Sequence, residues 1–163
     1  MLGKRSPDAR ICLLLFFAAK YIDKIGYRHA VIIAHVTAAV GLIGLAVLPT
    51  LLGNAYMGIM ISVVLYAIGG GIIEVLISPI VEACPTEKKE AAMSLLHSFY
   101  CWGHVGVVLI STLFFAWAGI QNWRILAVAW AVIPLINTYI FARTPIAPLI
   151  SEGEKGMSIA QLF

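Results

Sequence analysis

The chain has 163 residues, of which 61% are hydrophobic and only 12% are charged. A soluble domain carries about twice that share of charge, so this composition excludes an ordinary soluble domain. The net charge is +3, but the lysines and arginines stand singly or in pairs between apolar runs. Without a continuous basic stripe, nucleic-acid binding is disfavoured. The three cysteines are odd in number and lie in or beside apolar runs, so they do not describe a disulfide framework.

Long stretches without any charged residue predict membrane-spanning helices. Such stretches cover 30–73, 91–123 and 125–142. Because about 20 apolar residues cross a bilayer as a helix, they hold four spanning segments. A shorter apolar run, ICLLLFFAAKYI at 11–22, adds a fifth. The sequence thus predicts an all-α integral membrane protein, a polytopic bundle of about five transmembrane helices. The predicted parts are a polar stretch at 1–10, a bundle at 11–141 with segments 11–22, 30–52, 56–81, 92–118 and 123–141, and a cytoplasmic linker at 142–163.

The first segment has a second interpretation. A short apolar run after a basic stretch also fits a secretory signal peptide. Phe17 stands where a small residue should precede the cleavage point, which favours a membrane helix.

The connecting loops predict the orientation. Lysines and arginines gather after the first, third and fifth segments. The positive-inside rule then places those loops and the C-terminal tail in the cytoplasm, with the chain multi-pass in a plasma (inner) membrane. Tyr56, Trp117 and Trp123 fall near the outer interface, where amphipathic rings are favoured. The basic residues within 1–10 fall on the outer side, so we expect this start to be incomplete or displaced.

Glu74 stands inside an apolar run, after three glycines and before Pro79. A charge at hydrocarbon depth costs about 2.5–3.5 kcal/mol on insertion scales, so such a residue is a functional candidate. Ser78 lies one helical turn later on the same face, and Gly70 and Gly71 lie one turn earlier. A carboxyl there prefers its neutral form until a cation or solute stabilises the charge, so protonation can be coupled to solute binding. The alternative is a structural carboxyl satisfied by a neighbouring helix.

The next segment carries polar residues on one face. Ser94, His97, Cys101 and His104 share this face, and Tyr100 lies beside it. Two polar-faced helices joined by a short loop can face one another across a cavity. The histidines equally fit hydrogen bonding between helices. A metal site is a weak alternative because its ligands would come from three helices, so we expect no metal and no cofactor. No nucleophile-base spacing supports an enzyme.

Small residues predict where helices touch, because close backbone approach replaces the hydrophobic effect in lipid. Pro79 is expected to kink its helix by removing a backbone donor. The glycines expected at contacts are Gly41, Gly44, Gly69, Gly70, Gly71, Gly103 and Gly106.

The loop AKYIDKIGYRHA carries a motif. Asp23, Lys24, Gly26 and Arg28 match the pattern Gly-x-x-x-Asp-Arg/Lys-x-Gly-Arg/Lys-Arg/Lys, and the loop therefore resembles the connection between helices two and three of major facilitator superfamily transporters. The resemblance implies that these residues latch an inner gate. It also implies an ion pair from Glu82 to Arg28 or Lys24.

The middle of the chain, GGGIIEVLISPIVEACPTEKKEAAMSLLHSFYCWG, resembles helices four and five of the sugar-permease branch of that superfamily, which includes fucose-proton symporters. Glu74, Pro79 and the Leu-Leu-His run at 95–97 match this branch. Ser78 and Ser94 replace two asparagines of the branch.

Together the resemblances cover residues 11–143 and imply helices two to six of a transporter's N-terminal half, with a missing C-terminal half as partner. They imply that the chain is a fragment of a secondary active transporter that moves a small polar solute, a sugar in this branch, with protons by alternating access. The resemblance does not decide between symport and antiport, because a single carboxyl can couple proton movement to solute movement in either direction. The alternative is a truncated or split protein that acts only as an assembly partner. The residues expected to bind solute and proton are Glu74, Ser78, Ser94, His97 and Tyr100.

Overall fold

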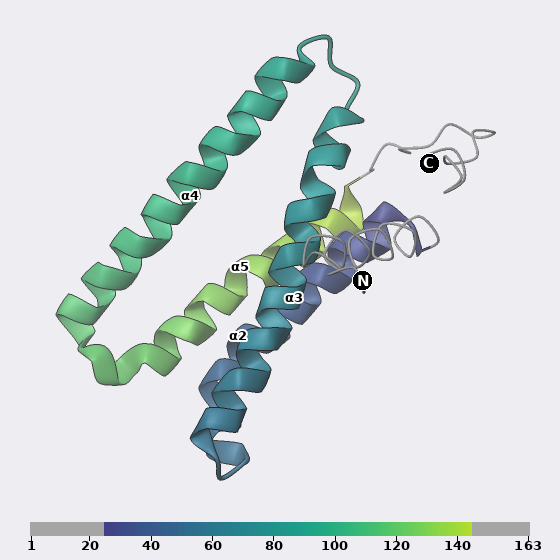
Figure 1. The fold of residues 1–163 in the computed structure, drawn as a ribbon. Helices are drawn as coiled ribbons and strands as arrows, with labels where there is room; N and C mark the ends of the chain where they lie inside the picture. The colour runs from purple at the N-terminus through teal and green to yellow at the C-terminus, as the bar shows by residue number, and fades with distance from the viewer. Residues whose placement is uncertain (1–24, 145–163) are drawn as a thin grey trace, which may run out of the picture.

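The computed structural model describes residues 25–144, which form four long helices and one short 3-10 turn (Figure 1). The elements are α2 Tyr27–Leu51, α3 Ala55–Glu82, α4 Lys89–Ala118, η1 Ile120–Asn122 and α5 Trp123–Arg143. The predicted all-α fold is confirmed for this part of the chain. The predicted segments at 1–10 and 11–22, the residues Asp23 and Lys24, and the linker after 144 lie outside it.

Four helical stretches are long and apolar enough to cross a membrane. They are α2, α3, α4 and the stretch Ile120–Arg143, with mean hydropathies from 1.6 to 2.5. They correspond to the four predicted segments that begin at residues 30, 56, 92 and 123. This length and composition support an integral membrane protein.

Short turns separate the helices. Gly53 takes a φ of 64° between α2 and α3, a left-handed conformation that glycine adopts without strain. Asn54 then caps α3, because its side-chain oxygen accepts a hydrogen bond from the Met57 amide at 3.2 Å. Gly119, with a φ of 81°, ends α4. These turns make successive helices run in opposite directions.

Glycine brings α3 close to α2. A Cβ placed on Gly69 would lie 2.5 Å from the Ala34 carbonyl oxygen and 2.6 Å from the Ala38 amide nitrogen. Gly41 and Gly58 likewise abut backbone of the opposing helix. Such close approach maximises dispersion contacts, which hold helices together where lipid removes the hydrophobic effect.

Helix α5 packs against the other side of α2. Near the N-terminal end of α2, Val31 and Leu76 are each 2% exposed, and Phe141 of α5 packs against the same cluster. The rings of His35 and Phe141 lie 5.3 Å apart. The Nη2 of Arg28 donates a hydrogen bond to the Thr144 carbonyl at 2.6 Å. The start of α2 and the ends of α3 and α5 therefore meet at one end of the bundle.

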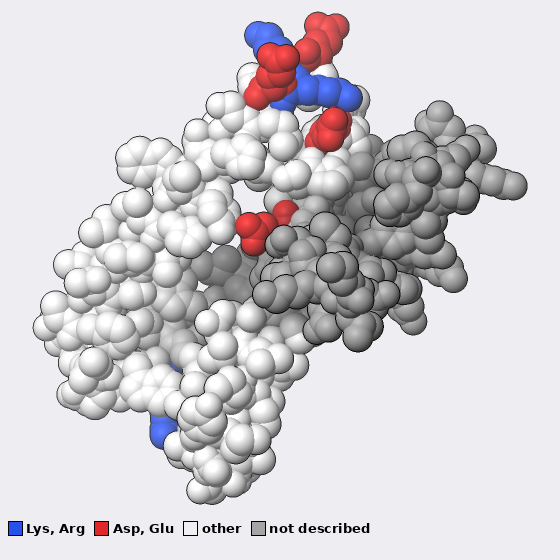
Figure 2. All heavy atoms as spheres, in the orientation of Figure 1, with Lys and Arg blue, Asp and Glu red and all other residues white. Residues whose placement is uncertain are grey.

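Helix α4 stands apart from the other three. It leaves the end of α3, diverges from it and returns to the bundle only where it joins α5 (Figure 1). None of its 30 residues is buried among the described residues. The space-filling view shows a hollow between this helix and the rest (Figure 2).

Candidate solute and proton site

Charged residues gather at one end of the described structure. Basic and acidic side chains cluster where α3 passes into α4, with a further patch of acidic atoms deeper in, beside the hollow (Figure 2). Arg28 at the start of α2 and Arg143 at the end of α5 belong to the same end of the bundle. At the opposite end, Arg124 lies 5.5 Å from the ring of Trp123. Apolar helix surface lies between the end that carries Arg28 and Arg143 and the end that carries Arg124.

Glu74 and His97 lie at similar distances along their helices from the connection between α3 and α4. Glu74 stands eight residues before Glu82, the last residue of α3. His97 stands eight residues after Lys89, the first residue of α4. At 1.5 Å per residue, each lies about 12 Å along its helix from the end where the two helices join. Both therefore lie inside helices that are long and apolar enough to cross a membrane.

Glu74 lies on the side of α3 that is turned away from α2. Gly69 and Leu76 are buried on the α2 side. At 100° per residue, Glu74 is rotated from these two by about 140° and 160°. Its side chain is exposed among the described residues, and that of Ser78, one turn later, is half-buried.

Four of the glycines predicted as packing positions border open space among the described residues. A Cβ on Gly70 or Gly71 would meet no described atom within 4 Å, and the same holds for Gly103 and Gly106 on α4. These four glycines therefore do not lie at contacts between the helices described in residues 25–144. Gly70 and Gly71 lie about one helical turn before Glu74 and leave room beside it.

One hydrogen bond fixes which way α4 is turned. Trp130 Nε1 of α5 donates to Ser111 Oγ of α4 at 3.2 Å. At 100° per residue, Tyr100, His104 and His97 lie within about 40° of the Ser111 direction. These side chains therefore lie on the same face of α4 as Ser111, the residue that bonds α5. The rings of Tyr100 and His104 also stack, with centroids 4.8 Å apart.

Ser94 is the predicted binding residue that departs from this face. It is rotated by about 100° from the Ser111 direction. Its carbonyl accepts a hydrogen bond from Ser98 Oγ at 2.9 Å. The structure thus groups His97 and Tyr100 and leaves Ser94 at the margin. Pro79 lies inside α3, one residue after Ser78.

The predicted gating residues fall at the charged end. Gly26, with a φ of 84°, precedes α2 and sets the angle at which the chain enters it. Arg28 bonds the end of α5, and in this conformation it forms no ion pair with Glu82, which is exposed. The anchor from Arg28 to Thr144 was not foreseen, since a backbone carbonyl at a helix end leaves no mark in the sequence.

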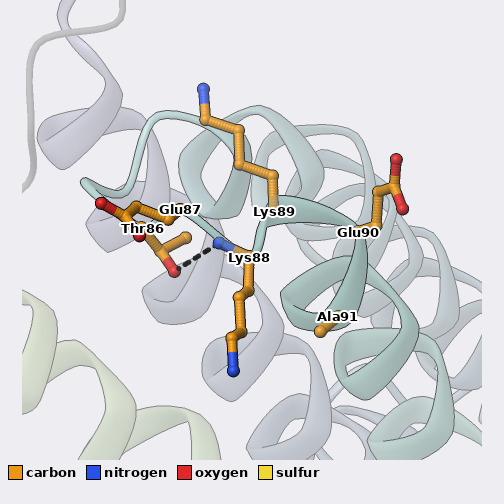
Figure 3. A pocket seen from close by; sticks show the side chains of 6 residues that line it. All are labelled: Thr86, Glu87, Lys88, Lys89, Glu90 and Ala91. Atoms are coloured by element: carbon orange, nitrogen blue, oxygen red, sulfur yellow. Dashed lines mark hydrogen bonds between the residues drawn. The ribbon is translucent and has the colours of Figure 1, made fainter.

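A shallow hollow of about 540 Å³ lies at the connection between α3 and α4. The Lys88 amide donates to Thr86 Oγ1 at 3.2 Å, which shapes the turn before α4. Lys88, Lys89 and Glu90 point in different directions (Figure 3). Because these charges do not converge, the hollow offers no defined ligand site. Among residues 25–144, no group of three or more His, Cys, Asp or Glu side chains could hold a metal ion.

Comparisons with protein-family models, with curated proteins and with solved structures give no match for this chain. The geometry of the described helices is therefore the basis for the function proposed below. Sequence reasoning missed Ser111 and Trp130, although a serine and an indole in apolar spans are each candidates for a bond between helices.

Proposed function

We propose that this chain takes part in secondary active transport of a small polar solute, coupled to protons. The observation that carries the proposal is the position of Glu74, an acidic side chain about 12 Å inside the α3 end. Charges at such depth are costly and mark solute, ion or proton pathways. A sugar is the solute class that the resemblance to sugar permeases implies.

The polar face of α4 supports this proposal. His97 and Tyr100 lie on the same face of α4 as Ser111, which bonds α5, and His97 is as far along α4 from the α3–α4 connection as Glu74 is along α3. Hydrogen-bonding groups from two helices at one level, beside a hollow, are suited to a solute that carries hydroxyl or amine groups. Alternating access would open this region to one side of the membrane and then to the other.

The basic ends support an orientation. Arg28, Lys88, Lys89 and Arg143 lie at one end of the described helices, and Arg124 lies at the other. Under the positive-inside rule, we propose that the end with four basic residues faces the cytoplasm of a plasma (inner) membrane. The gating role of Gly26, Arg28 and the neighbouring motif residues is part of the same proposal.

The substitution Glu74→Gln tests the coupling. It removes the titratable group and keeps the size and hydrogen-bonding capacity of the side chain. We expect pH-driven solute accumulation in proteoliposomes to be abolished, with membrane insertion unchanged. The matched control is Glu87→Gln, the same substitution in the exposed loop before α4. Accumulation by Glu74→Gln at the rate of the unmodified chain would contradict the proposal.

A second function is favoured by one observation. Helix α4 buries none of its residues among those described, so it has surface available for other helices. A chain that serves only as an assembly partner would show no solute uptake alone, and Glu74→Gln would leave co-purification with its partner unchanged.

A further inference from the structure

Two residues of opposite charge stand inside apolar spans near the same end of the bundle. The five predicted spans contain three charged residues, Lys20, Glu74 and Arg124. Arg124 is the second residue of α5, at the end of the bundle opposite to the start of α2. Lys20 stands two residues before the end of the apolar segment 11–22, which leads into α2 through residues 23–26. Charged side chains within membrane spans pair with one another, so Lys20 and Glu74 are candidate partners.

The length of the chain permits this pairing. Val31 of α2 and Leu76 of α3 belong to one buried cluster, so they lie at about the same level. A helix over the apolar segment that brings Lys20 level with Glu74 ends at the level of Leu76. From there to the first residue of α2, the linker must cover about 6 Å along the bundle and about 8–10 Å between helix axes. Five steps along the chain reach about 16–18 Å, so the linker is long enough.

The face of α3 that carries Glu74 has room for another helix. Gly70 and Gly71 lie one turn before Glu74, and a Cβ on either would meet no described atom within 4 Å. Ala67 lies one turn further back on this face and is exposed among the described residues. Small residues let helix backbones approach closely in lipid, as Gly69 does on the α2 side of the same helix. This face therefore offers a second contact surface for a helix.

The segment 11–22 matches this face in spacing. Phe16 and Phe17 stand four and three residues before Lys20. The two glycines stand at the same distances before Glu74. The segment leads into α2 at the end where α3 finishes, so as a helix it runs parallel to α3. In one register, therefore, large rings fall beside glycines and a positive charge falls beside a negative one.

We propose that residues 11–22 pack as a helix along this face of α3, with Lys20 paired to Glu74 and the two phenylalanines over the two glycines. The carboxylate is then balanced by a neighbouring helix of the same chain. The inference does not rest on the proposed transport function, because it follows from charge, space and chain length.

Disulfide cross-linking tests the register. In the full chain with its three cysteines replaced by alanine, Phe16→Cys is combined with Gly70→Cys, or with Ile68→Cys as the control. Ile68 is likewise exposed among the described residues but is rotated by about 160° from Gly70. Mild oxidation in membrane vesicles should close the disulfide to position 70 within one chain about tenfold faster than the disulfide to position 68, because a disulfide needs Cα atoms within about 7 Å. Mass spectrometry of the protected thiols and a non-reducing gel measure the bond and whether it joins one chain or two.

Exchanging the two charges tests the ion pair. Lys20→Glu places two carboxylates together and Glu74→Lys places two ammonium groups together, so each should lower the melting temperature of the full chain in detergent by about 6–20 °C. The variant with both reversals restores opposite charges and should recover about half or more of the larger loss. The matched control is Glu87→Lys, the same reversal in the exposed loop before α4, which should melt within about 2 °C of the unmodified chain.

Equal or absent cross-linking of the two cysteine pairs would overturn this inference. A double charge variant no more stable than the weaker single variant would do the same. Disulfide-linked dimers in place of the bond within one chain would also overturn it, since the partner helix would then come from a second copy. Neither readout involves a solute, so these results leave the transport function to its own test with Glu74→Gln.

Discussion

Two neighbouring glycines of α3 allow a sharp test of helix packing. Gly69 faces the backbone of α2, with the Ala34 oxygen and the Ala38 nitrogen 2.5 and 2.6 Å from an added Cβ. Gly70 meets no described atom within 4 Å. Both lie well inside α3, so the change in helix propensity on substitution by alanine is the same at each. The difference between the two variants therefore isolates the contact with α2.

The size of the effect follows from the atoms that would collide. Neither the Ala34 carbonyl nor the Ala38 amide can move without shifting α2, since both are backbone groups. Overpacking of this kind typically costs about 1–3 kcal/mol. For a chain of this length, each kcal/mol lowers the melting temperature by about 2–4 °C. We expect Gly69→Ala to melt about 2–12 °C below Gly70→Ala, and Gly70→Ala to melt at or slightly above the unmodified chain.

Thermal unfolding in a single detergent, followed by the fraction that stays monodisperse, measures this difference. Far-UV circular dichroism before heating shows whether the helix content of the two variants is equal. Equal melting temperatures for Gly69→Ala and Gly70→Ala, or a lower one for Gly70→Ala, would refute the close approach of α2 and α3 at Gly69.

Two further predictions concern α4 and the orientation of the chain. A double-mutant cycle of Trp130→Phe and Ser111→Ala should give a coupling energy of about 0.5–1.5 kcal/mol in thermal unfolding, because the two side chains share one hydrogen bond; strictly additive losses would show that this bond does not hold α4. Cys84, exposed just after α3, should react with a membrane-impermeant maleimide only from the cytoplasmic side in oriented vesicles, and labelling from the outside would reverse the proposed orientation.

The helical segments could be predicted because hydrocarbon permits few alternatives. A stretch without charges that is long enough to cross a bilayer must satisfy its backbone internally, and a helix does so. Gly53 and Asn54 mark a turn and a helix start through local conformation and hydrogen bonding alone. The structure places helices over the four predicted segments that it describes, with ends differing by a few residues.

The candidate site was predictable only in part. Helical spacing associates His97 with Tyr100 and His104, because residues three, four and seven apart share a face, and the rings of Tyr100 and His104 stack in the structure. The same spacing included Ser94, which the Trp130 to Ser111 bond places about a quarter turn from the inward direction. Gly69, Gly70 and Gly71 also look equivalent in the sequence, but only a Cβ on Gly69 would contact α2.

The sequence by itself determined which residues form helices, where those helices turn, and that Glu74 lies deep along an apolar span. Only the tertiary structure decided which side of each helix meets a neighbour, and that Arg28 bonds the end of α5. The reason is that the period of 3.6 residues fixes the relative angles of side chains on one helix. The rotation of that helix against its neighbours depends on contacts between residues far apart in the chain, such as Gly69 with Ala34 and Trp130 with Ser111.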